Sequence, residues 1–232
     1  MRGNKRLLSL AVVALLFTAF SAISANAQGV LSEILNRMDT NNKSLKSLKA
    51  SIKMSKHNAQ LDEYDLYEGG VQYIPAASKE QIKVRIDWAK PVVEHLAVGA
   101  GQYILYRPRL EQAIIGKVSD TKGNSSTAGG ALAFMSMNRA QLKANYDVAY
   151  IGEETVNGSV KTWHIQLTPK NAASYKSADL WVDTNGMPVQ AKVIERNNDS
   201  TTVQLTNIER NATVAANVFQ LKPPKNTKII QG

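Results

Sequence analysis

The sequence contains no cysteine in its 232 residues and only three histidines. Without cysteine the chain can form no disulfide, and it lacks the residue that carries the acyl chains of a lipoprotein. The histidines are His57, His95 and His164, which lie far apart and outside the spacings of metal-binding motifs. His164 alternates with apolar Trp163 and Ile165, so its side chain is expected to point away from the interior. We therefore expect no metal site.

Sequence motifs of catalysis and cofactor binding are also absent. The chain has no GxSxG, no HExxH, no P-loop and no GxGxxG. Gly99 and Gly101 lie between two predicted strands rather than before a helix, which indicates a turn and not a phosphate site. Glu153 and Glu154 are adjacent, so their side chains point apart. We expect no enzyme activity and no cofactor; a secreted enzyme for small substrates is the alternative with the least support.

The charge distribution restricts the partners that can be expected. The chain has 28 Lys and Arg residues against 19 Asp and Glu residues. The basic residues are scattered and do not form a stripe with stacking aromatics, so nucleic acid is not an expected partner. A solvated basic surface is the simplest interpretation, and attraction to an anionic membrane surface is the alternative.

A long apolar run occurs at the N-terminus. Three basic residues precede the mostly apolar stretch Leu7–Phe20, and Ala25 and Ala27 then give the small-x-small pattern of a signal peptidase site. The pattern predicts a signal peptide over residues 1–27, cleavage after about Ala27 and export from the cytoplasm. An uncleaved N-terminal anchor is the alternative. Residues 28–232 then suit one domain, which we expect to be a monomer.

Alternating apolar and polar residues dominate the rest of the chain. Gln81–Trp88 is the clearest case, and hairpin signals follow at Asn157-Gly158 and Asn185-Gly186. About ten or eleven short strands at regular spacing predict an antiparallel barrel or sandwich. One apolar face per strand forms either a packed core or a lined cavity. The residues expected on this inner face include Ile82, Val84, Ile86, Trp88, Leu96, Trp163, Ile165, Leu167, Leu180, Val182, Val193, Val203 and Leu205.

One segment has a helical pattern, and a second interrupts the run of predicted strands. Gly29–Asp39 has the apolar spacing of an amphipathic helix that covers an apolar surface. The stretch 129–142 follows a Gly/Ser-rich segment and places four large apolar residues close together. These residues are Leu132, Phe134, Met135 and Met137. They form either an ordinary core helix or a cover that moves.

Several segments together carry a resemblance to a known family. The first is LSEILNRMDTNNKSLKSLKASIKM, where a helix pattern leads into a Leu-Lys-Ala strand entry. RIDWAKP and GAGQYILYRPRLEQAI follow, and the chain ends with LWVDTNGMPVQAKVIERNNDSTTVQL and NVFQLKPPKNTKII. In order and spacing these segments resemble LolA, the family of periplasmic carriers of outer-membrane lipoproteins. The resemblance extends over essentially all of residues 28–232.

The resemblance implies a fold and a function. The fold is mainly β with α: one unclosed antiparallel barrel, covered by an N-terminal helix and a short lid helix. The residues Leu132, Phe134, Met135 and Met137 then form the lid, and the inner-face residues line a cavity for acyl chains. The family carries acylated lipoproteins from an inner-membrane ABC transporter to an outer-membrane receptor, without catalysis or cofactor.

The sequence departs from the family pattern at one point. Family members often have an arginine before the proline of an early strand, which ties the barrel wall to the lid. Here Ile74 precedes Pro75, so the lid must be held differently. A sensing module similar to RseB, or a carrier of another lipid, is the alternative on the same scaffold; RseB-like chains have an extra C-terminal domain.

Overall fold

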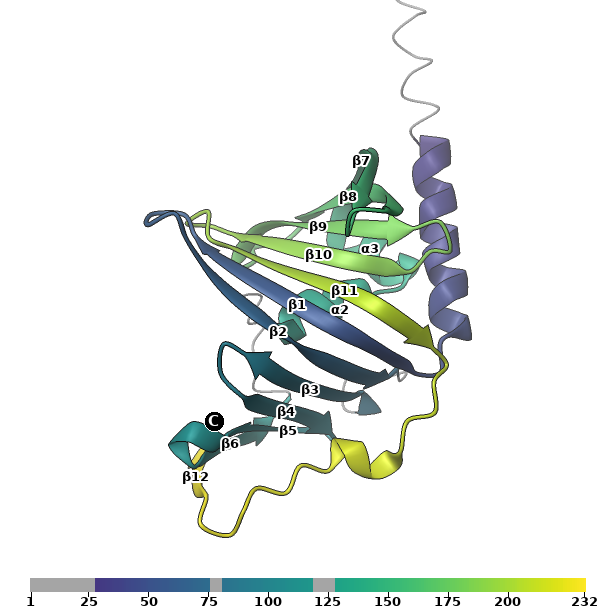
Figure 1. Ribbon diagram of the computed structural model, residues 1–232. Helices are drawn as coiled ribbons and strands as arrows, with labels where there is room; N and C mark the ends of the chain where they lie inside the picture. Colours follow the sequence, from purple (N-terminus) through teal and green to yellow (C-terminus); the bar gives the residue numbers. More distant parts are fainter. Residues whose placement is uncertain (1–27, 76–80, 119–127) are drawn as a thin grey trace, which may run out of the picture.

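The computed structural model describes residues 28–75, 81–118 and 128–232, and within these ranges twelve strands form one sheet (Figure 1). The predicted signal peptide lies outside the described residues. The strand order is β12-β6-β5-β4-β3-β2-β1-β11-β10-β9-β8-β7. The sheet curls without closing, as predicted for an unclosed barrel, and its two edges are β12 and β7.

The elements have the following bounds. The strands are β1 (Leu48–Asn58), β2 (Glu63–Ile74), β3 (Lys83–Lys90), β4 (Glu94–Gly99), β5 (Gln102–Arg107), β6 (Gln112–Lys117), β7 (Tyr146–Val156), β8 (Val160–Pro169), β9 (Tyr175–Asp183), β10 (Pro188–Glu195), β11 (Ser200–Arg210) and β12 (Lys228–Gln231). The short helices are η2 (Pro108–Leu110), α2 (Ala128–Met135), α3 (Arg139–Asn145) and η3 (Ala216–Phe219). Residues 28–44 form the N-terminal helix.

The strand count corrects the expectation of ten or eleven. The C-terminal tail, predicted only as a last extended stretch, is a true strand. Its residues Lys228–Gln231 pair in parallel with Gln112–Ile115 of β6, whereas the other neighbours in the sheet pair antiparallel. The tail thus protects the hydrogen-bonding edge of β6.

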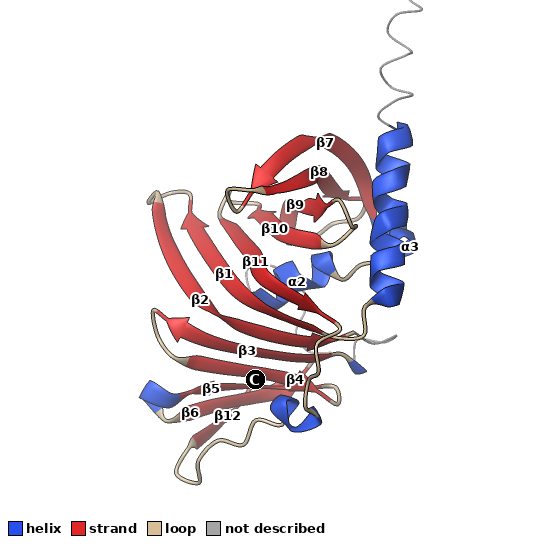
Figure 2. Cartoon of the chain, turned by 45° about the vertical axis from the view of Figure 1, so that its right-hand side comes forward, coloured by secondary structure: helices blue, strands red, loops and turns tan. Residues whose placement is uncertain are grey.

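Side-chain alternation gives the sheet two distinct faces. The concave face contributes Ile52, Ile86, Ile165 and Leu180 to one hydrophobic cluster, and each is fully buried. Figure 2 shows α2 lying inside the curl of the sheet, where it contacts β9, β10 and β11. On the convex face the chain after β11 brings η3 against β3 and β4, and its Phe219 is buried.

The N-terminal helix closes one end of the curl, as its amphipathic pattern predicts. Its apolar residues Ile34, Leu35 and Met38 are fully buried in the same hydrophobic cluster. The turn between β9 and β10 allows this close contact because Gly186, at φ +82°, has no β-carbon; one would overlap the Arg37 main chain. The Arg37 guanidinium also donates to the Thr184 carbonyl at 2.7 Å. Within the described residues no helix is long and apolar enough to cross a bilayer.

Candidate functional site

The predicted inner-face residues mostly meet on the concave side of the sheet. Those inside the buried cluster are Ile86, Trp88, Ile165, Leu167, Leu180, Val182, Val193, Val203 and Leu205. Val84, Leu96 and Trp163 are partly buried and pack against it. Ile82 precedes β3, is partly buried and lies outside this cluster. The alternation of the strands therefore brings distant segments onto one apolar surface.

The predicted lid residues lie inside the curl. Phe134 and Met135 are 4% and 5% exposed and belong to the core cluster. Leu132 and Met137 are partly buried and pack against the same cluster. The lid helix implied by the resemblance at residues 128–137 corresponds to α2, which ends at Met135; Asn138 then begins a second helix, α3, with a capping box.

An aromatic pocket receives Phe134. Its ring meets Tyr175 edge-on at a centroid distance of 5.4 Å and lies 6.0 Å from the ring of Tyr146. The two tyrosine hydroxyls share a hydrogen bond of 2.7 Å, and burial raises the pKa of Tyr175 far above its ordinary value. Both rings come from strand starts at β7 and β9. The pocket fixes α2 against the sheet through apolar contact and leaves the hydroxyls paired.

A small set of polar contacts holds the end of α2. Ser136, directly after the helix, donates to the Ala133 carbonyl at 2.9 Å. Its side chain lies close to the hydroxyl of Tyr73, whose pKa is raised by burial and lowered less by Ser136. The Asn42 amide donates to the Met137 carbonyl at 3.1 Å, which links this junction to the N-terminal helix. Ile74 occupies the position at which family members often have an arginine, and Tyr73 directly precedes it. The polar contact from β2 to the end of α2 is therefore made by two neutral hydroxyls.

The concave wall differs between its two halves. Under α2, Ile165, Leu180 and Val203 are completely buried. On the β3–β6 half, Ile86 and Trp88 are buried, but six other apolar side chains of the same face are only partly buried, namely Val84, Leu96, Val98, Tyr103, Leu105 and Ile114. Apolar surface that is only partly covered can gain further burial from an apolar ligand.

The convex face has a polar cluster that alternation alone did not predict. His164 points outward as expected, but its side chain is only 13% exposed. Its Nδ1 lies 2.7 Å from Glu154 and its Nε2 lies 3.0 Å from Asp179, while its ring stacks on Trp181. The cluster depends on the register of β7, β8 and β9, which no local motif reveals. Across the described residues no group of three or more His, Asp or Glu is arranged to hold a metal.

A hollow of about 330 Å³ also lies among β1, β2, β3 and β11. Polar and charged groups supply most of its lining, including Lys49, Gln72, Asp87, Asn207 and Glu209. Such a lining does not suit an acyl chain, which gains nothing from charged neighbours. The concave surface around α2 is the better candidate site.

Comparison with known families agrees with this architecture. The family model described as "Outer membrane lipoprotein carrier protein LolA" matches residues 81–222. The chain belongs to the LolA family. The match spans the strands of the half-barrel from β3 to β11 together with α2.

Among the similar solved structures, the two with TM-scores above 0.5 share the fold at low sequence identity. An uncharacterised conserved protein from Thermus thermophilus is 12% identical, with a TM-score of 0.54 over 88% of this chain and 99% of that one. MucB is 15% identical, with a TM-score of 0.52 over 89% of this chain and 66% of its own. A LolA superfamily protein from Nitrosomonas europaea is 13% identical, with a TM-score of 0.41 over 81% and 96% of the two chains. No curated protein matches the sequence.

Proposed function

We propose that this member of the LolA family is a periplasmic carrier that shields the acyl chains of lipoproteins on its concave face. The supporting observation is the position of α2, a helix of eight residues whose Phe134 and Met135 fill the interior of the curled sheet. When cargo arrives, α2 leaves this position and acyl chains take its place. The carrier then moves its cargo from the inner to the outer membrane.

The energetics of burial support a lid that exchanges with cargo. Each buried methylene stabilises the complex by about 0.8 kcal/mol, so a long acyl chain contributes on the order of 10 kcal/mol. Removing buried Phe134 from its pocket costs roughly 3–5 kcal/mol, judged from Phe-to-Ala substitutions in cores. Displacement of α2 therefore offsets part of the gain from cargo binding. The remaining affinity is strong enough for transport and weak enough for release.

The proposed partners follow from family membership. An inner-membrane ABC transporter supplies the acylated lipoprotein, and an outer-membrane receptor accepts it. The carrier role needs no catalytic group and no cofactor. A sensing module that binds lipoproteins without moving them would use the same concave face, so the test must measure transfer as well as binding.

The test combines native purification with a release assay. Protein purified from periplasm without detergent should contain lipoprotein or phospholipid, which mass spectrometry of an organic extract detects. The same protein should release lipoproteins from inner-membrane vesicles and pass them to outer-membrane vesicles. Repeated recovery of lipid-free protein that releases nothing would contradict the proposal. Binding without any transfer would instead support the sensing module.

A matched pair of variants distinguishes an effect of α2 on acyl-chain binding from a general loss of stability. Phe134→Ala empties the aromatic pocket under α2, whereas Phe219→Ala removes a ring of similar burial from the convex side. If α2 competes with cargo, Phe134→Ala should bind acyl probes more tightly than the wild type. Phe219→Ala should be destabilised without this gain in affinity. Equal probe affinity in the two variants would argue that α2 is a permanent part of the hydrophobic core and does not exchange with cargo.

A further inference from the structure

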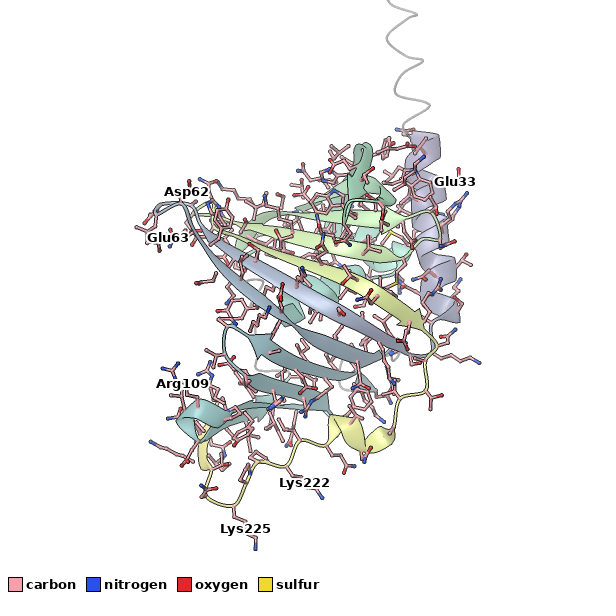
Figure 3. All side chains as sticks on the ribbon, viewed as in Figure 1. Glu33, Asp62, Glu63, Arg109, Lys222 and Lys225 are labelled. Carbon is pink, nitrogen blue, oxygen red and sulfur yellow. The ribbon has the colours of Figure 1, made fainter. Side chains whose placement is uncertain are left out.

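One corner of the molecule combines basic and exposed apolar side chains. It consists of η2, the segment 221–227 and the start of β12, near the point where β5 ends and β6 begins. We call Arg109, Leu110, Lys222, Lys225, Lys228 and Ile229 the basic corner. Figure 3 labels Arg109, Lys222 and Lys225, which project from this end of the molecule into solvent.

Hydrogen bonds bring the two segments of the corner together. The Lys228 main-chain N–H donates to the Glu111 carbonyl at 2.7 Å, and Lys228 and Ile229 are register partners of Gln112 and Ala113. Lys225 lies in a turn that is closed by the Thr227 N–H and the Pro224 carbonyl at 3.0 Å. The basic side chains are thus presented by ordered backbone at the sheet edge.

The charge of this corner is one-sided. Segments 108–112 and 221–231 contain four basic residues, and Glu111 is the single acidic residue in them. The nearby Arg107 guanidinium faces Glu94 at 3.0 Å, so that pair adds no net charge. At the β1–β2 hairpin the balance is reversed, because Asp62 and Glu63 lie there (Figure 3). The basic corner is therefore a local feature and not the average surface.

Exposed aliphatic side chains accompany these charges. Leu110 is 53% exposed and Ile229 is 49% exposed. Segments 108–112 and 221–231 contain no aromatic residue on which a base could stack, which argues against single-stranded nucleic acid. Lysine and arginine around protruding aliphatic groups are what the interface of an anionic bilayer attracts and accommodates.

We propose that the basic corner docks the protein on the surface of a bilayer that contains anionic phospholipids. The cations meet the headgroups, and Leu110 and Ile229 enter the boundary of the acyl region. Docking goes beyond the carrier role and does not depend on it, because it requires no lipoprotein and no movement of α2.

A vesicle flotation assay with the full-length mature chain tests the docking. The protein should float with vesicles of phosphatidylethanolamine and phosphatidylglycerol and remain behind with vesicles of phosphatidylcholine alone. Each basic residue near an anionic leaflet adds about a fivefold factor to partitioning, so Lys222→Gln/Lys225→Gln/Lys228→Gln should lose at least about tenfold. The matched control Lys43→Gln/Lys46→Gln/Lys161→Gln removes the same charge at exposed positions of the N-terminal helix, its following turn and β8.

The aliphatic contribution has its own variants. Leu110→Ser/Ile229→Ser should weaken binding to the anionic vesicles severalfold, whereas Ile151→Ser, which changes a side chain of similar exposure on β7, should not. The proposal is overturned if the wild type does not float with anionic vesicles, or if both lysine variants lose binding equally. It is also overturned if the corner instead mediates self-association, seen as a concentration-dependent dimer that the corner variant abolishes without any vesicle binding.

Discussion

At the scale of single residues, the contact between Tyr73 and Ser136 adds to the packing that holds α2. A pair of neutral hydroxyls contributes at most about 1 kcal/mol to stability, so it favours the packed position of α2 without fixing it there. The sequence indicated that the position before Pro75 lacks the family arginine. It could not indicate the substitute, because Tyr73 and Ser136 meet only after β2 and α2 pack together.

Tyr73→Phe should loosen α2 while leaving the fold intact. The phenylalanine ring keeps the packing and removes only the hydroxyl, so opening of α2 should become about fivefold more frequent. Hydrogen exchange of the amides of residues 132–137 measures this opening. Tyr64→Phe, at a side chain that is 61% exposed, is the control and should leave that exchange unchanged. Identical exchange in Tyr73→Phe and the wild type would mean that the hydroxyl pair does not hold the lid.

Glu154 makes the stability of the fold depend on pH through the polar cluster on the convex face. The indole N–H of Trp181 donates to Glu154, and His164 contacts it as well; these bonds lower the Glu154 pKa more than burial raises it. A lowered carboxyl pKa stabilises the fold above the unfolded value, near 4.3, and this stabilisation is lost as the pH falls through the folded value. Glu154→Gln should thus be less stable than the wild type near neutral pH, and the difference should shrink in acid.

Urea unfolding of both proteins over a pH series measures that difference. Glu153→Gln is the control, since it removes the same charge from the neighbouring exposed position. A gap between the wild type and Glu154→Gln that stays constant down to about pH 3 would contradict the assignment.

At the scale of elements, the N-terminal helix and the β9–β10 turn depend on each other. Gly186→Ala forces a β-carbon into the Arg37 main chain and keeps an unfavourable positive φ. Gly158→Ala has a similar φ of +74° but meets no atom within 4 Å. The second variant should lose about 1–2 kcal/mol from backbone strain, and the first should lose clearly more because the helix must shift. Thermal unfolding compares them; equal losses would show that the close contact is unimportant.

The sequence predicted the type of most elements because burial imposes a period on each one. Ile165 and Leu167 alternate with outward residues, and Ile34, Leu35 and Met38 repeat at helical spacing, so both patterns are local. The division of 129–142 into α2 and α3 was missed. Its signal was available in Asn138 with Gln141 three residues later, which is the spacing of a capping box.

At the scale of the whole molecule, the sheet is built from pairings that no local pattern specifies. β1 lies between β2 and β11, and β12 crosses to pair in parallel with β6. Such long-range choices depend on the complete set of strands competing for partners. For the same reason the open curl of the sheet could be expected from the family resemblance, but the convex cluster around His164 could not.

Removal of residues 228–232 should expose the edge of β6. That edge contains Ile114 and Ile115, and an unprotected apolar edge strand promotes association between sheets. The shortened protein should form larger species at concentrations where the full chain does not, as light scattering after size-exclusion chromatography would show. Ile229→Ser keeps the β12 backbone and should stay monodisperse. A monodisperse shortened chain would mean that β12 does not protect the sheet.

The central claim is that α2 must leave the concave face before acyl chains can bind there. The most direct test locks α2 to β2 with a short bis-maleimide in a Tyr73→Cys/Ser136→Cys variant, in a chain that has no other cysteine. Binding of a triacylated lipopeptide should fall at least about tenfold on cross-linking. A cross-linked Ser55→Cys/Thr202→Cys control, which joins register partners of β1 and β11 on the convex face, should bind as before. Unchanged lipopeptide binding by the locked lid variant would contradict the account.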